Sequence, residues 1–209
     1  MFRSLTRLSA LAAFSLLLAG CGALGTPPVA QALFDLGAVD AVAMDAGQRP
    51  VSVEVRAPSW LTTSAMQYRL GYADPQRRLA YGESRWVAPP AEMLALALDR
   101  ALLAPGNGGS GCRLRVQIDE LVQVFDTEAR SRVLISARAS LLPQRGETPV
   151  AGRDVAVQVA APSADAPGGV AATREAVHRL AGELAAWITT LDPSDGQRLN
   201  GGAGCRPER

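Results

Sequence analysis

Lysine is absent from this sequence, so all 21 basic residues are arginines, set against 20 acidic residues for a formal net charge of +1. The absence of lysine excludes Schiff-base chemistry and a Walker A phosphate-binding loop. Charge is nearly balanced, with no block of one sign, so the composition gives no indication of nucleic acid binding. Aromatic residues make up only 5% of the chain, and histidine occurs once.

The single histidine, His178, is a weak candidate for chemistry. It lies between Glu175 and Arg179 on the polar face of a predicted helix, where we expect it to be solvated. A histidine-based metal site would need a second histidine. The adjacent Asp119 and Glu120 fall on a predicted strand, where neighbouring side chains point to opposite faces, so they make a poor acid–base pair. The sequence therefore predicts no catalytic residues, no metal ligands and no cofactor.

No apolar run reaches the roughly 20 residues that span a bilayer, but the N-terminus has the pattern of a secretion signal. Arg3 and Arg7 precede an apolar segment over residues 8–19, which ends in Leu-Ala-Gly-Cys at residues 18–21. This ending matches the lipobox, where a signal peptidase cuts before a cysteine that carries diacylglycerol. We therefore predict that residues 1–20 are a lipoprotein signal peptide and that Cys21 becomes the lipidated N-terminus.

The residue after the lipidated cysteine indicates the destination of the protein. An aspartate there favours retention in the inner membrane of Gram-negative bacteria, and this chain has Gly22. We therefore expect a lipid anchor in the outer membrane, facing the periplasm. The predicted tether, residues 21–28, spans under about 30 Å, so the folded domain should lie close to the membrane surface.

Two cysteines remain after lipidation, Cys112 and Cys205. An even number in an oxidising compartment fits one disulfide. The alternative is two free thiols. We predict the disulfide.

Residues 29–191 are predicted to form a single α+β domain, in which two helices pack on a mainly antiparallel sheet. Alternating apolar residues predict strands over 51–56, 66–72, 77–81, 113–125, 132–142 and 150–159, with the last three forming an antiparallel meander. Apolar residues at helical spacing predict a helix opening at Pro90 and another over 170–191 that buries Val177, Leu184 and Trp187. In the strand over 113–125, the alternation places Leu114, Val122 and Val124 on one face, and a bulge is expected near Glu120, where the pattern breaks. Residues 161–169, rich in alanine, proline and glycine, are predicted to form a loop, and residues 192–209 are predicted to be a flexible tail.

The most distinctive stretch is aromatic, with arginines interleaved, between residues 60 and 86. Tyrosine, tryptophan and arginine are enriched at interaction hot spots. The candidate partner-binding residues are Trp60, Tyr68, Tyr72, Arg85 and Trp86, with Trp60 and Trp86 expected in connecting loops. The alternative is that these aromatic residues pack in the core and at the sheet edge.

Five segments together form a recognisable pattern, residues 34–37, 53–61, 66–75, 81–86 and 114–126. Through them, from about residue 34 to residue 187, the sequence resembles a known family, the ABC-type transport auxiliary lipoproteins, often described as PqiC-like. The resemblance implies a non-enzymatic subunit of an intermembrane lipid-transport system. The partners implied are an inner-membrane ABC transporter and an MCE-domain protein that bridges the periplasm, and a homo-oligomer of the chain is compatible with this interpretation. The tail after residue 191, including Cys205, has no counterpart in the family pattern.

Two other classes of function are weighed against this interpretation. One is an envelope assembly or structural lipoprotein, such as an activator of a cell-wall synthase or a secretin pilot, for which a longer tether would be expected. The other is a hydrolase, which would need a nucleophile and a base that these residues do not assemble.

Overall fold

The computed structural model describes residues 30–103, 109–191 and 205. The predicted signal peptide, the tether and the tail other than Cys205 lie outside the described residues. The fold belongs to the unit that runs from Gln31 to Arg209. No helix among the described residues has both the length and the apolar character needed to cross a membrane.

One sheet of seven strands, counted over the described residues, organises the domain, in the order β1-β4-β3-β5-β6-β7 with β2 also paired to β5. The strands are β1 (Ala32–Phe34), β2 (Ser52–Arg56), β3 (Ala65–Leu70), β4 (Asp74–Trp86), β5 (Arg113–Thr127), β6 (Arg130–Leu142) and β7 (Ala151–Ala160). The antiparallel meander β5–β6–β7 is confirmed, and β3 and β4 form a second antiparallel pair. The predicted single α+β domain is thereby confirmed.

Three parallel pairs make the sheet mixed, and the sequence did not predict them. β1 pairs with β4, while β2 and β3 both pair with β5. β2 follows the first part of β5, at residues 113–117, and β3 follows its last part, at residues 123–125. The long central strand therefore holds two short strands along the same edge.

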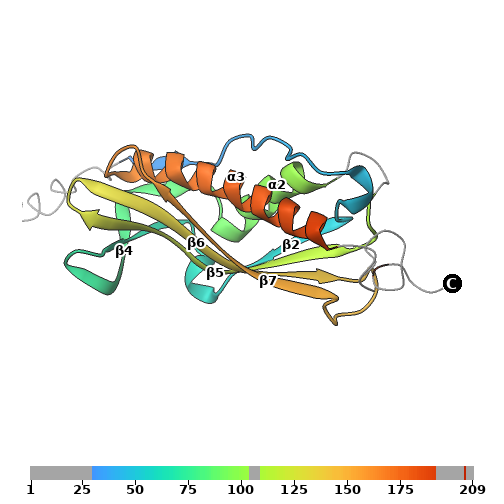
Figure 1. The fold of residues 1–209 in the computed structure, drawn as a ribbon. Coiled ribbons are helices and arrows are strands. Elements are labelled where there is room, and N and C mark those ends of the chain that lie inside the picture. Colours follow the sequence, from blue (N-terminus) through green and yellow to red (C-terminus); the bar gives the residue numbers. More distant parts are fainter. Residues whose placement is uncertain (1–29, 104–108, 192–204, 206–209) are drawn as a thin grey trace, which may run out of the picture. The chain divides into compact units, whose positions relative to one another are not determined.

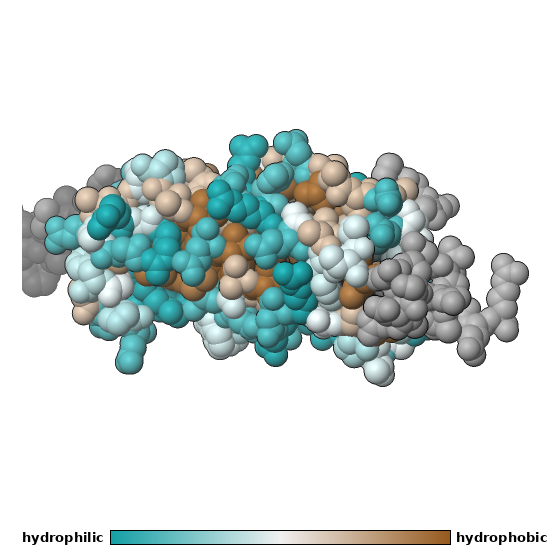
Figure 2. Space-filling view, in the orientation of Figure 1, coloured by the Kyte–Doolittle hydropathy of each residue, from teal (hydrophilic) through white to brown (hydrophobic). Residues whose placement is uncertain are grey.

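Two long helices cover one face of the sheet, α2 (Pro90–Leu102) and α3 (Ala166–Thr190) (Figure 1). The apolar stripe of α2 is buried as predicted, and Val177, Leu184 and Trp187 of α3 are all buried. Figure 2 shows apolar side chains between α3 and the strands, with hydrophilic side chains around them. The core therefore lies between the helices and this face of the sheet.

Helix α3 begins at Ala166 rather than at the predicted residue 170. Asp165 is its N-cap, and the Asp165 carboxylate accepts a hydrogen bond of 2.7 Å from the Gly168 N–H. The Ala-, Pro- and Gly-rich composition suggested a loop here, but proline is tolerated in the first turn of a helix. An aspartate N-cap satisfies an amide that the helix leaves unpaired.

The predicted bulge in β5 is confirmed, because the register with β6 shifts between Ile118 and Glu120. Its effect on the second half of the strand was not predicted correctly. Val122 and Val124 were expected on the same face as Leu114, but Leu121 instead joins the core. One extra residue in a strand reverses the alternation of side chains that follows it.

Candidate interaction site

The five residues predicted to bind a partner divide into an inner and an exposed group. Trp86 is only 5% exposed and belongs to the core. Its expected position in a loop is wrong, because β4 extends to it and Trp86 pairs with Phe34 of β1. Tyr68 is half-buried, and its ring lies 4.7 Å from that of Tyr81. Trp60, Tyr72 and Arg85 are exposed.

The exposed residues lie at two ends of the β3–β4 hairpin. Trp60 belongs to the short helix η3 (Ser59–Leu61), and its carbonyl accepts a 2.6 Å hydrogen bond from Gln67 Nε2 of β3. Arg85 is in register with Ala65, the first residue of β3, so Trp60 and Arg85 lie near the same end of the hairpin. Tyr72 lies in the turn after β3, about 15–20 Å away at the usual strand rise.

Trp60 and Tyr72 are large aromatic side chains left in solvent, 53% and 45% exposed. Tryptophan, tyrosine and arginine are the residue types that are enriched at protein interaction hot spots. We name Trp60 and Arg85 the η3–β4 surface. No catalytic chemistry is indicated at this surface, because neither side chain is a nucleophile or a general base.

A buried polar network lies behind the hairpin and docks α3. The Tyr81 hydroxyl donates to Gln123 Oε1 at 2.9 Å, and Gln123 Nε2 donates to Ser131 Oγ at 2.8 Å and to the Asp165 carbonyl at 3.0 Å. Burial is the main cause that raises the pKa of Tyr81, with smaller contributions from Tyr68 and Asp165. Tyr81 therefore remains a neutral hydrogen-bond donor, which suits a structural role.

The bulge changes the expected geometry of Asp119 and Glu120. Their side chains were predicted to point to opposite faces of the sheet. The arginines that they bind place both side chains on the same face, the one that α2 and α3 do not cover, which we call the open face. Asp119 binds Arg138 through both oxygens, at 2.7 and 3.0 Å, and Glu120 binds Arg69 at 2.7 Å and also Arg78. Both carboxylates are held in ion pairs, so neither is positioned as a free base.

Further ion pairs follow the first half of β5 on this open face. Arg115 binds Glu54 and Glu147, each at 2.7 Å. Hydrogen bonding to Arg115 is the main cause that lowers the pKa of Glu54, and likewise that of Glu147. Both carboxylates therefore stay ionised and paired, and the open face is a polar surface.

His178 is exposed on α3, as predicted. Within the described part of the chain, no group of three or more histidine, cysteine, aspartate or glutamate side chains could hold a metal ion.

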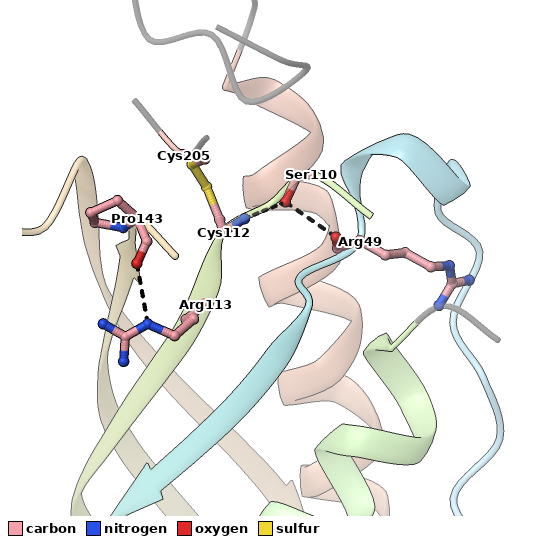
Figure 3. Close-up of a disulfide and its surroundings, with 6 residues drawn as sticks. All are labelled: Arg49, Ser110, Cys112, Arg113, Pro143 and Cys205. Atoms are coloured by element: carbon pink, nitrogen blue, oxygen red, sulfur yellow. Dashed lines mark hydrogen bonds between the residues drawn. A yellow bond between two sulfur atoms is a disulfide. The ribbon is translucent and has the colours of Figure 1, made fainter. Parts of the chain in front are cut away.

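Cys112 and Cys205 are joined by a disulfide in the structure, with a Cα–Cα distance of 4.9 Å (Figure 3). Cys112 precedes β5 directly, and its N–H donates to Ser110 Oγ at 3.2 Å. The Cys205 carbonyl accepts a hydrogen bond of 3.2 Å from the Gln144 N–H in the loop after β6. Residue 205 is therefore held beside the first residues of β5 and the last of β6.

A groove along α2 was not predicted from the sequence. It has a volume of about 550 Å³ and lies between the segment that follows β1 and the outer side of α2. Val87 and Leu96 on its rim are each 53% exposed. Leu96 could have indicated this groove, because it is a leucine that falls outside the buried apolar stripe of α2.

Comparisons with known proteins agree with this architecture. The crystal structure of protein XCC0632 from Xanthomonas campestris, of the family DUF330, is similar with a TM-score of 0.63 and 18% identity, over 79% of this chain and 99% of that chain. The crystal structure of an uncharacterized protein is similar with a TM-score of 0.58 and 16% identity, over 76% of this chain and 99% of that chain. At these identities the likeness concerns the fold alone. No curated protein matches the sequence significantly.

The sequence model of one family covers most of the domain. It is described as the ABC-type transport auxiliary lipoprotein component, and it matches residues 34–185. The match includes the η3–β4 surface, the groove along α2 and most of α3. The chain therefore belongs to the family of ABC-type transport auxiliary lipoprotein components, which are membrane-anchored envelope lipoproteins associated with transport.

Proposed function

We propose that this chain is a non-enzymatic outer-membrane lipoprotein of an ABC/MCE-type intermembrane lipid-transport system. In this role it docks the periplasm-spanning MCE-domain protein at the outer membrane, while the ABC transporter lies in the inner membrane. The observation that carries the proposal is the family match over residues 34–185.

The η3–β4 surface is the proposed contact with the partner. Trp60 offers a large exposed ring, and Arg85 offers a guanidinium for which no ion pair is recorded among the described residues. Such residues contribute most when a partner covers them and excludes water. Tyr72 lies at the other end of the hairpin and would contact the same partner only if the interface extends along β3–β4. Tyr68 and Trp86 would support this surface from within the domain.

Affinity purification from detergent-solubilised envelopes tests the docking. We expect the wild-type protein to co-purify with an MCE-domain protein. Trp60→Ala and Arg85→Ala should each weaken this binding by about 2 kcal/mol, roughly 30-fold, with the thermal unfolding transition preserved. Arg130→Ala is the matched control, because Arg130 is an exposed arginine at the start of β6, outside the η3–β4 surface. Recovery of cell-wall synthase or secretin subunits in place of an MCE-domain protein would favour the envelope-assembly alternative.

The membrane location is tested by two variants near the lipobox. Cys21→Ala removes the sulfur that the lipid transferase needs, so the precursor should accumulate uncleaved and be lost from the outer-membrane fraction. Gly22→Asp should leave lipidation and cleavage intact but retain the mature protein in the inner membrane. Metabolic labelling with a fatty-acid analogue, followed by membrane fractionation, separates these cases. A wild-type protein that takes up no label would contradict the lipidation of Cys21.

A further inference from the structure

The groove along α2 combines an apolar floor with an apolar rim that is open to solvent. Leu36, Met93 and Ala97 form the buried floor. Val87 and Leu96 stand on the rim, and more than half of each side chain is exposed. Every apolar residue on the groove is aliphatic or methionine. Ligand sites of this size are mostly apolar and carry a few polar groups that orient the ligand.

The charged residues of the groove are separated along α2. Glu92, Leu96 and Arg100 are spaced four residues apart, so they form one exposed stripe along the helix. At a rise of 1.5 Å per residue, Arg100 lies about 12 Å from Glu92. Asp35 follows β1 and lies beside the start of α2, because the Val87 N–H donates to the Phe34 carbonyl at 2.9 Å. The groove therefore has an acidic end, an aliphatic middle and a single cation at the other end.

Arg100 is free to bind an external anion. It is exposed, and among the residues that the structure describes no ion pair or side-chain hydrogen bond is recorded for it. It is also the one basic residue among the described residues that line the groove. Arginine binds phosphate oxygens with two parallel hydrogen bonds.

An amphiphile with an anionic head group fits this arrangement. Its phosphate would meet Arg100, and an acyl chain would run along Leu96 and Met93 toward Val87, with the acidic end of the groove beyond it. Membrane lipids are within reach, since the chain between the predicted lipidation site at Cys21 and β1 spans at most about 40 Å. We propose that the groove along α2 binds one acyl chain of a membrane phospholipid, whose phosphate pairs with Arg100.

This proposal rests on the membrane anchoring of the protein but not on the docking of an MCE-domain protein. The two have separate readouts, since one is measured by lipid adducts and the other by co-purification. A failure of either proposal therefore leaves the other standing.

Photo-crosslinking in intact cells tests the proposal with the full chain. Cells are fed a fatty acid that carries a photoreactive diazirine, which enters their phospholipids, and are then irradiated. Because the chain has no lysine, trypsin cuts only after arginine, and residues 86–100 form one peptide that carries Val87, Met93, Leu96 and Arg100. We expect phospholipid adducts on this peptide to exceed by at least fivefold those on the peptide of residues 57–69, which carries the exposed Trp60.

Variants of exposed residues complete the test without disturbing the core. Leu96→Asp should reduce the adduct at least fivefold, and Arg100→Gln should also reduce it, with detection on the longer peptide that then ends at Arg113. Val51→Asp changes an exposed valine outside the groove and should leave the adduct unchanged. The proposal is overturned if the adduct survives Leu96→Asp, if its mass is that of a free fatty acid, or if it joins the peptide to the protein's own lipidated N-terminus.

Discussion

The two faces of the sheet are stabilised in different ways. On the covered face, the strands and the helices α2 and α3 bury a continuous apolar core, with side chains such as Leu98, Leu180 and Leu184 fully buried. On the open face, arginines and carboxylates form pairs, including Arg115 with Glu54 and Arg138 with Asp119. Burial of apolar area stabilises a fold by far more per residue than exposed ion pairs do. The open face can therefore accept changes that the covered face cannot.

The largest expected effect is the loss of a core side chain beneath α3. Leu180→Ala should lower the free energy of unfolding by about 3 kcal/mol, because it leaves a cavity in a close-packed layer. Chemical denaturation monitored by circular dichroism measures the change. Glu183→Ala is the control on the same helix, and it should change the free energy of unfolding by less than about 0.5 kcal/mol, since Glu183 is exposed. Equal effects of the two variants would contradict the assignment of the covered face.

A smaller loss is expected where α3 meets the polar network of the covered face. A Cβ atom at Gly169 would collide with Gln123 Oε1, which is held by Tyr81. Gly169→Ala should therefore destabilise the domain by about 2 kcal/mol through overpacking.

The control is a glycine of the same helix that has free space around it. A Cβ atom at Gly182 would meet nothing within 4 Å, so Gly182→Ala should stabilise the domain by about 0.5–1 kcal/mol. In a Gln123→Ala background, the cost of Gly169→Ala should shrink, and a double-mutant cycle measures this coupling. The absence of coupling would mean that the two residues do not meet.

On the open face, the largest loss of stability is expected at Glu120. The Glu120 side chain is 17% exposed and binds two arginines that are themselves less than one-third exposed. Glu120→Gln leaves the guanidinium groups of Arg69 and Arg78 without a carboxylate, and should cost about 1–2 kcal/mol. Asp119→Asn, which affects a more exposed pair, should cost clearly less in the same denaturation assay. The reverse order would show that burial does not decide the strength of these pairs.

The smallest expected loss of stability concerns Asp165, whose carboxylate caps the start of α3. A hydrogen bond from Ser163, followed by one from the Gly168 N–H, lowers the pKa of Asp165. Its stabilising contribution is therefore present above the ordinary aspartate pKa of about 3.9 and is lost as the pH falls through the lower folded-state value. Asp165→Ala should cost about 1 kcal/mol at neutral pH. Asp165→Asn should keep most of the cap while removing its pH dependence, which thermal unfolding between pH 2 and pH 7 can measure.

The helices and the meander that they cover could be predicted from local patterns in the sequence. Contacts between segments that are distant in the sequence could not be predicted from these patterns. The meander and both helices follow from the spacing of apolar residues along single segments, such as Met93, Leu94 and Ala97 of α2. The parallel pairs β2–β5 and β3–β5 join segments that are remote in sequence, and no periodicity specifies them. The bulge was predicted at Glu120, but its consequence for Leu121 required the register with β6.

The five residues of the candidate interaction site were predicted from their residue types. In the structure only three of them are exposed. Trp60, Tyr72 and Arg85 lie in solvent, whereas Trp86 is buried in the core. A single sequence does not show which aromatic residues are covered, because burial depends on packing between segments that are remote in sequence. Trp86 of β4 lines the same small cavity as Pro90 of α2 and Leu121 of β5. The binding role of the exposed residues remains a prediction that the co-purification experiment addresses.

The disulfide has a consequence for how the chain is connected. The bond between Cys112 and Cys205 spans 93 residues, and it closes β5, β6, β7 and α3 into a covalent ring, outside which β1 to β4 and α2 remain. A protease cut inside the ring would leave the two pieces attached to each other, while a cut between α2 and β5 would free the N-terminal half. Such bonds persist outside the reducing cytoplasm, so the closed ring would mark those molecules that have completed export. Peptide mapping without reduction would then count exported molecules directly, by the fraction in which residues 112 and 205 are joined.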